Sequence, residues 1–477
     1  MSRPVISQSI QTIRSAWALV MVSVTGPTLP SGRGSVTAMS HQPYQSTGSA
    51  VGGPPHAPLP PSGPGWAPSG ASQPPPGPGW APHGPYAGVG EPANTTPRRT
   101  LRRVVLTGVA VTLFALCGLF MAILVAESTG ATAALLGVLT GSIALGIVVP
   151  VLLWVDRLEA EPARIMWFAF LWGALVSTAG ALILNEVGMA FFAGLELDPL
   201  FTGAVLVAPL VEEALKCLGV LVIFLVARRE FNGLVDGIVY AGMVAVGFAF
   251  VENIIYLGGA YSELGTPGLL GIFVMRVLVS PFAHPMFTVA FGIALGLITH
   301  RRQWRFAFVP VLGYVVAVFL HFLWNFAAVS TMDGFLVAYV LVQVPLFIGF
   351  VLLLVLSRRS ETRMLRTHLT GYGLNGWFTP AEVAMLVSPR ERRRARAWAK
   401  GVGGSRAEAA MEAFQDEASE LAIARQHLER GDSDPVWQLR ERALLQTVQA
   451  RRVTFAPPRP MQAYAAQPRI VPVPHKL

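Results

Sequence analysis

The chain has few charged residues. Asp, Glu, Lys and Arg make up 13% of its 477 residues and hydrophobic residues 53%, whereas about 25% of a typical soluble domain is charged. This composition excludes a soluble globular protein, and most of the chain is expected to lie in lipid. Cysteine is also scarce. Cys117 and Cys217 both fall inside apolar runs, which excludes a disulfide-stabilised scaffold and a zinc site built from cysteines.

The excess of positive charge lies at the two ends of the chain. Residues 1–103 hold 7 basic and 1 acidic residue, residues 104–357 hold 9 and 14, and residues 358–477 hold 20 and 12. Basic segments beside a membrane domain typically contact anionic lipid at the cytoplasmic face. We therefore expect anionic lipid as a partner, and no nucleic acid.

Composition divides the chain into three regions. Residues 1–100 include a Pro/Gly-rich stretch, about 41–96, in which GPGWAP occurs twice. Such a segment buries no core, so a disordered cytoplasmic tail is expected. Residues 101–357 are predicted to form an eight-helix intramembrane domain, and residues 358–477 a small, basic, helical cytoplasmic module. We also hypothesise that translation begins at Met39, because the low-complexity tail follows it directly.

Eight apolar segments are each long enough, at about 20 residues, to cross a bilayer as a helix. Their approximate limits are 104–126, 131–155, 165–184, 200–227, 237–257, 269–299, 306–329 and 335–356. Every second connecting loop carries arginines: Arg157 and Arg164, Arg228 and Arg229, Arg301, Arg302 and Arg305, then Arg358 and Arg359. Because basic residues stay on the cytoplasmic side, this alternation predicts an all-α, multi-pass protein of the cell membrane with both termini in the cytoplasm.

Capping signals predict helices in the C-terminal region. Residues 379–382 and 388–391 are capping boxes with proline at the first helical position. Residues 405–408 predict the start of a third helix that ends near Gly431. The basic stretch 390–400 is expected to contact lipid headgroups, with a solvated helix face as the alternative.

Ionisable side chains are rare in the apolar segments, and each costs about 2.5 to 3.5 kcal/mol when it faces lipid. They cluster in four consecutive segments, the fourth to the seventh. In chain order, with two neighbouring amides, they are Glu212, Glu213, Lys216, Glu252, Asn253, Arg276, His284, His321 and Asn325. We expect these side chains to face one another in one pocket, with Lys216 and Arg276 in structural ion pairs.

Helical spacing orders these residues locally. Lys216 lies four residues after Glu212 and three after Glu213, so both carboxylates reach its ammonium while one remains available for chemistry. His321 and Asn325 are also four residues apart and share a face.

Glu252 and His284 are predicted to lie at different depths in the membrane. Counted at 1.5 Å per residue from the outer helix ends, Glu252 lies about 8 Å deep and His284 about 22 Å deep. A single site requires closer levels. Pro281 and Pro285 flank His284 and are expected to bend its helix.

Two imidazoles with carboxylates form the ligand set of a catalytic zinc site. We predict His284, His321 and Glu252 as ligands of a divalent metal, for which zinc fits best, with one of the paired glutamates taking a proton from water. Without metal, the carboxylates activate water directly, while imidazole and Asn325 stabilise the oxyanion. Both chemistries end in hydrolysis. The candidate catalytic residues are Glu212, Glu213, Glu252, His284 and Asn325.

Several separated motifs carry a family resemblance. APLVEEALK, DGIVYAGMVAVGFAFVENIIY, a histidine in the next segment, and HFLWN resemble the PrsW family of intramembrane proteases in their order along residues 104–356. DRLEAEP at 156–162 is similar to that family's acidic loop. The motifs also resemble a wider superfamily that includes the CAAX prenyl proteases, which have His where this chain has Glu252 and an HxxxN pair matched by His321 and Asn325.

The resemblance implies site-specific proteolysis of a membrane-anchored protein, such as an anti-sigma factor cut on its extracytoplasmic side. By motif, it assigns active-site positions to Glu212 and Glu213, to Glu252 and to His284. The family is usually classed as metallopeptidase, and related enzymes act as glutamate proteases without metal, so both mechanisms stay open.

Two other functions remain open. An ion-coupled transporter also places Glu, Lys and His in the membrane, but it predicts an internal repeat, and the first four segments do not resemble the last four. A membrane-anchored signalling scaffold uses its tails to bind partners, but it leaves the buried carboxylates unexplained.

Overall fold

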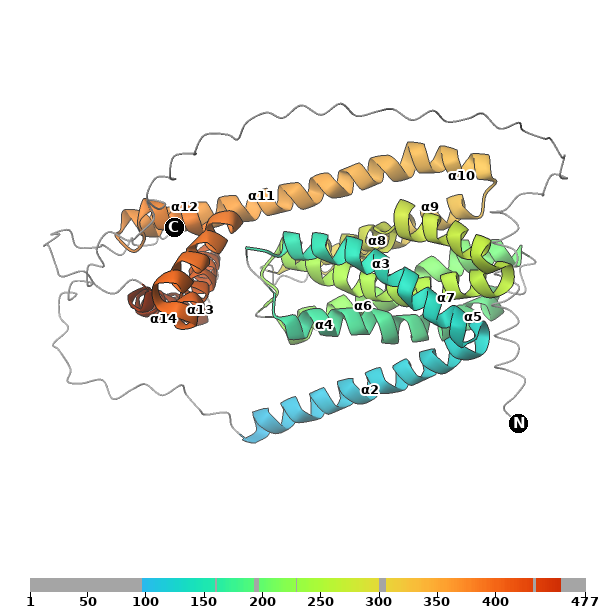
Figure 1. Ribbon diagram of the computed structural model, residues 1–477, viewed down its shortest axis with the longest axis horizontal. Coiled ribbons are helices and arrows are strands. Elements are labelled where there is room, and N and C mark those ends of the chain that lie inside the picture. Colours follow the sequence, from blue (N-terminus) through green and yellow to red (C-terminus); the bar gives the residue numbers. More distant parts are fainter. Residues whose placement is uncertain are drawn as a thin grey trace, which may run out of the picture.

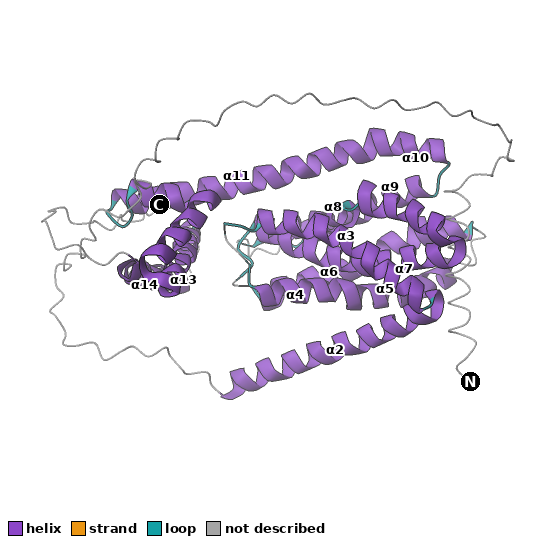
Figure 2. Ribbon diagram, in the orientation of Figure 1, coloured by secondary structure: helices purple, strands orange, loops and turns teal. Residues whose placement is uncertain are grey.

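The computed structural model describes residues 97–158, 161–192, 197–228, 230–299, 306–431 and 435–455. Every regular element in these residues is a helix (Figure 2), which confirms the predicted all-α class. The Pro/Gly-rich stretch and the proposed start at Met39 lie outside the described residues.

The helices follow one another through short connections, and those marked η are π-helical segments. In chain order they are α2 (Pro97–Thr129), α3 (Ala131–Val155), α4 (Ala163–Leu171), η1 (Trp172–Ser177), α5 (Thr178–Phe192), η3 (Phe201–Val207), α6 (Ala208–Val226), α7 (Leu234–Phe273), η4 (Val274–Val279), α8 (Ala283–Ile298), α9 (Phe308–Ala328), α10 (Met332–Ala338), η6 (Tyr339–Gln343), α11 (Val344–Leu374), α12 (Pro380–Leu386), α13 (Pro389–Glu429) and α14 (Pro435–Phe455).

Helices α3 to α9 form the central bundle, with α2 along one side and α11 along the opposite side (Figure 1). Helix α7 is the central element, because all its residues from Asp236 to Phe248 are buried. A helix that is apolar and enclosed on every side belongs to the interior of a bundle. Exposed apolar side chains cover α2 instead, including Val109, Leu116 and Ile123, as expected of a helix that faces lipid.

Six segments of the described chain are long and apolar enough to cross a membrane. They are Val104–Thr129, Ala131–Val155, Ala163–Phe192, Leu234–Ile298, Phe308–Ala328 and Asp333–Leu374. The longest segment folds back on itself at Gly265 (φ 65°) and so contains two of the predicted passes. Helix α6 is also of membrane-spanning length, but it carries three charged residues. The arrangement agrees with the predicted bundle of about eight helices.

Two glycines bring α7 and α8 into close contact. A Cβ atom on Gly292 would lie 2.0 Å from the carbonyl oxygen of Gly237, and a Cβ on Gly237 would lie 2.1 Å from the carbonyl oxygen of Gly292. Only glycine permits two helix backbones to approach this closely. The contact fixes α8, which carries His284, against the central helix.

The C-terminal helices α12, α13 and α14 gather beyond one end of the bundle (Figure 1). Thr379 and Glu382 form the predicted capping box, and the Ser388 hydroxyl accepts a hydrogen bond from the amide of Glu391. Helix α13 bends at Gly404 (φ 67°), where a third helix was predicted to start, and it ends at Glu429. The predicted domain boundary at residue 357 falls inside α11, which joins the two regions as a continuous helix.

Arg392 anchors this C-terminal module to the membrane domain. Its guanidinium is buried and donates hydrogen bonds to the carbonyl oxygens of Leu386 and Leu158, at 2.7 and 3.0 Å. Burial lowers the pKa of Arg392 to about 10. Other basic residues of the stretch 390–400 form ion pairs within the module: Arg394 with Glu391, Arg396 with Glu412, and Lys400 with Glu408. Lipid contact by this stretch stays a prediction.

Candidate active site

The EExxK sequence of α6 lies at the centre of the bundle. Glu212, Glu213 and Lys216 are all buried, and the last two have no exposed surface. Lys216 Nζ lies 2.6 Å from Glu213 Oε1 and 3.9 Å from Glu212 Oε2. The ammonium also lies over the Phe248 ring, 4.3 Å from its centroid. The lysine therefore pairs closely with one glutamate and only loosely with the other.

Glu213 is fully engaged by its neighbours. Besides Lys216, its Oε1 atom lies 3.0 Å from His321 Nδ1 on α9, and its Oε2 accepts a hydrogen bond from the Thr288 hydroxyl of α8 at 2.8 Å. A buried carboxylate with three partners is stable as a charged group. Glu213 thus joins α6, α8 and α9 and has no free side.

Glu252 connects two further elements. Its Oε2 atom lies 2.7 Å from His284 Nε2 and 2.6 Å from Arg276 Nη2. Arg276 also donates from Nε to Asn253 Oδ1 at 2.8 Å, and its guanidinium stacks on the Tyr256 ring. Arg276 is in η4, which follows the turn at Gly265 and runs back along α7. The other ring nitrogen of His284, Nδ1, lies 3.2 Å from Lys216 Nζ.

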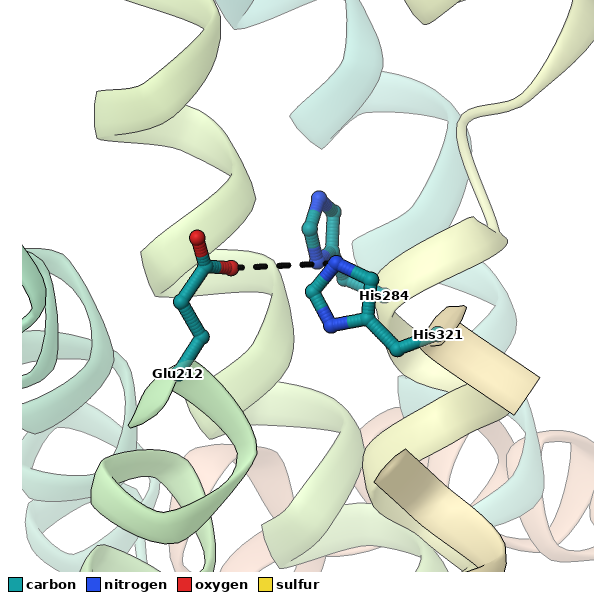
Figure 3. A group of neighbouring side chains, drawn as sticks. All are labelled: Glu212, His284 and His321. Atoms are coloured by element: carbon teal, nitrogen blue, oxygen red, sulfur yellow. Dashed lines mark ion pairs between the residues drawn. The ribbon is translucent and has the colours of Figure 1, made fainter. Parts of the chain in front are cut away.

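Three of these side chains converge from three helices (Figure 3). Glu212 from α6, His284 from α8 and His321 from α9 are buried, and one potential ligand atom from each lies within 4.8 Å of the other two. His321 Nε2 lies 3.8 Å from Glu212 Oε2, the approach that the dashed line marks. Glu212 Oε2 is buried without a hydrogen-bond partner among the described residues.

The residues of this group fit a metal ion. Two imidazole nitrogens and a carboxylate oxygen are a donor set that zinc commonly takes. Each histidine has a carboxylate at its other ring nitrogen, Glu252 for His284 and Glu213 for His321. Such carboxylates typically orient metal-binding imidazoles. With neutral imidazoles, Glu212, Glu213 and Glu252 bring three negative charges, and Lys216 and Arg276 bring the two positive charges that pair with them in the described part of the chain. One negative charge is left for a cation or a proton to balance.

The predicted site residues come together with two differences in arrangement. Glu252 was predicted as a metal ligand, but its Oε2 atom contacts the Nε2 nitrogen of His284, and Glu252 is not part of the three-residue group. Asn325 donates from Nδ2 to the carbonyl oxygen of Ala204 in η3, which engages one of its two amide hydrogens. Thr288 was missed by the sequence analysis. Its position four residues after His284, on the same helix face, was the available signal.

Comparisons with known proteins agree with this site. The profile described as "PrsW family intramembrane metalloprotease" matches residues 161–350. A "Protease PrsW" of Clostridioides difficile is 29% identical over 191 residues, which cover 38% of this chain and 76% of that protein. A "Protease PrsW" of Geobacillus kaustophilus is 31% identical over 170 residues, which cover 35% of this chain and 68% of that protein.

No solved structure matches the chain at a significant level. The matched region spans the helices that carry Glu212, Glu252, His284 and His321. The described chain has several helices that can span a membrane, and the matched family is described as intramembrane. The protein is therefore a multi-pass membrane peptidase. We conclude that the chain belongs to the PrsW family of intramembrane proteases.

Proposed function

We propose that Glu212, His284 and His321 form the reaction centre, where water attacks a peptide bond of a membrane-anchored protein. One observation carries the proposal: no hydrogen-bond partner for the buried Glu212 Oε2 is found among the residues that the structure describes, and two oriented imidazoles lie beside it. An unsatisfied buried carboxylate costs about 1–3 kcal/mol or more. That cost is retained where the group must receive a ligand, a water or a proton.

The neighbouring residues Glu212 and Glu213 have different roles in this proposal. Glu212 holds or deprotonates the attacking water, since its nearest charged or imidazole partners in the described chain, Lys216 and His321, lie 3.9 and 3.8 Å from its Oε2 atom. Glu213 is a positioning residue, because Lys216, Thr288 and His321 occupy its oxygens. It fixes the His321 ring so that Nε2 points toward Glu212.

Two histidines present their remaining nitrogens to the same space. Glu252 accepts from His284 Nε2 and leaves Nδ1 directed toward Lys216 and the reaction centre. We infer that Glu212, His284 and His321 would hold a divalent metal, and zinc fits best. A bound zinc ion would acidify water and polarise the scissile carbonyl. Lys216 and Asn325 are the candidates for stabilising the oxyanion, through the ammonium charge and the second amide hydrogen.

The location of the reaction centre supports a membrane-anchored protein as the substrate. Its residues come from helices that are buried in the bundle, so the scissile bond must enter the membrane domain as part of an anchored segment. A regulator of the anti-sigma-factor type is an example of such a substrate. Orientation follows the arginine pattern of the loops, which supports both termini in the cytoplasm.

Elemental analysis beside a cleavage assay tests the proposal. We expect about one equivalent of zinc in detergent-purified protein, and loss of zinc and activity together in His284→Ala and His321→Ala. Full activity in zinc-free protein that is abolished by Glu212→Gln supports direct water activation by the same residues. Full activity in both histidine variants would exclude this reaction centre.

A further inference from the structure

A small cavity lies beside the reaction centre. Its volume is about 30 Å³, and its wall is made by residues of α3, α7, η4, α8 and α9. The lining residues used below are Ala144, Ala249, Asn253, Arg276, His284 and Trp324. His284 belongs both to this cavity and to the group with Glu212 and His321. A group bound in the cavity therefore lies one side chain away from the reacting atoms.

The cavity wall has two chemically different parts. Ala144 and Ala249 contribute methyl groups, and Trp324 contributes an indole. Arg276 and Asn253 contribute the polar part, and they are already joined by the bond from Arg276 Nε to Asn253 Oδ1. In the described part of the chain, Arg276 Nη1 and Asn253 Nδ2 donate no hydrogen bond, so each keeps a donor.

These donors matter to a substrate held in a membrane. A transmembrane helix must lose part of its internal hydrogen bonding before a peptide bond is accessible to water. Its freed carbonyl groups then need donors, because lipid supplies none. An amide and a guanidinium beside the histidine supply donors of this kind.

Volume restricts what the apolar part of the cavity accepts. A cavity that holds one water molecule needs about 10–15 Å³ by this measure. A volume of about 30 Å³ therefore accepts about two or three non-hydrogen atoms. The side chains of alanine, serine and cysteine fit, whereas leucine and phenylalanine are too large.

We propose that this cavity is the specificity subsite of the protease, which receives a small side chain next to the scissile bond. The inference rests on the proposed function, because it takes His284 as part of the reaction centre. It adds a substrate rule that the reaction centre alone does not provide: the bond cleaved is flanked by Ala, Ser, Cys or Gly on the side that faces the cavity.

Two variants change the cavity in opposite directions. Ala249→Leu fills it, because Ala249 is half-buried in its wall. Leu145→Ala enlarges it, because Leu145 is a further lining residue of α3. Ala122→Leu is the matched control, since Ala122 is exposed on α2 and outside the site.

Cleavage profiling measures the effect without a known substrate. The probe is a defined mixture of synthetic peptides in detergent that contains all pairs of neighbouring residue types, and mass spectrometry identifies the bonds cut by full-length protein. We expect the wild type and Ala122→Leu to prefer small residues over Leu and Phe at one flanking position by at least about 10-fold. Ala249→Leu should restrict that position to Gly, and Leu145→Ala should admit Val and Leu.

The outcomes separate this inference from the proposed function. If the wild type cleaves peptides with equal use of Ala, Leu and Phe, or if neither variant moves the preference, the subsite is wrong and the reaction centre still stands. If Glu212→Gln cleaves the peptides as fast as the wild type does, the proposed reaction centre is wrong, and the subsite proposal, which rests on it, is also wrong. A reciprocal change in the two variants supports both.

Discussion

His284 Nε2 lies 2.7 Å from Glu252 Oε2, and the same oxygen lies 2.6 Å from Arg276 Nη2. This shared carboxylate connects α7, η4 and α8 at one point. It fixes the orientation of the His284 ring, so Nδ1 faces Lys216 on α6. Arg276 thus acts on the reaction centre through Glu252, without touching Glu212 or His321 itself.

Arg276→Met is expected to lower kcat by about 10- to 100-fold, the usual effect of losing a residue that orients a metal-binding or catalytic imidazole. The fall in kcat measures the loss of His284 orientation, and a rise in KM measures the loss of the Arg276 Nη1 donor from the cavity wall. Arg276→Lys should recover part of the loss by keeping the charge. Arg396→Gln, which removes an ion pair in the C-terminal module, serves as the control. Equal kcat in wild type and Arg276→Met would rule out the positioning role.

Lys216→Met is expected to destabilise the fold by about 3–5 kcal/mol, because it leaves the fully buried Glu213 carboxylate without its closest cation. The double variant Glu213→Gln/Lys216→Met removes both charges and should regain part of that stability. Thermal unfolding in detergent measures the four proteins of this cycle. Additive effects of the two substitutions would mean that the ion pair contributes no coupling.

Gly292→Ala is expected to separate α8 from α7, because the added methyl would meet the Gly237 carbonyl at 2.0 Å. Overpacking of this kind costs about 1–3 kcal/mol, and it also shifts His284 relative to α6. Both melting temperature and cleavage should therefore fall. Gly349→Ala is the control, since its new Cβ meets no atom within 4 Å. Wild-type stability and activity in Gly292→Ala would contradict the close contact of the two helices.

Alkaline pH is expected to destabilise the junction beyond α3. Burial, with the nearby Asp236 carboxylate, raises the pKa of Asp156 to about 8, although its oxygens accept the amide of Glu161. In an unfolded chain an aspartate has a pKa of about 3.9. The folded state therefore holds an extra proton between these values, and the free energy of unfolding falls as the pH rises from about 4 to 8.

Asp156→Asn should remove this part of the pH dependence and raise the melting temperature at pH 9 relative to wild type. Melting curves in detergent at pH 5, 7 and 9 provide the comparison. The same slope against pH in the variant and the wild type would assign the effect to other groups.

Much of the fold was predictable because it follows from local patterns. Long apolar segments, alternating arginine loops and the capping box at Thr379 depend on short stretches of sequence, and the helices appear where they were expected. The spacing of Glu212, Glu213 and Lys216 predicted that both carboxylates reach the ammonium, and Lys216 Nζ lies 2.6 Å from Glu213 and 3.9 Å from Glu212. The arginine pattern remains the basis for the predicted orientation in the membrane.

Pairing between helices was less predictable, because it depends on backbone breaks. Depth counting put Glu252 and His284 on different levels. The turn at Gly265 and the break at Ser280, which ends η4 before α8 begins, bring the two side chains to 2.7 Å. The sequence did not indicate that Arg276 would pair with Glu252, since the two residues are 24 positions apart and the turn at Gly265 lies between them.

The central claim is that Glu212 is the carboxylate that acts on water. Cleavage of a reconstituted single-pass substrate by Glu212→Gln tests it most directly, with Glu186→Gln on α5 as the control. We predict that Glu212→Gln loses about 10²- to 10⁴-fold in activity, the range typical of a lost general base, while its melting temperature stays near that of the wild type. Cleavage by Glu212→Gln at the wild-type rate would contradict the account.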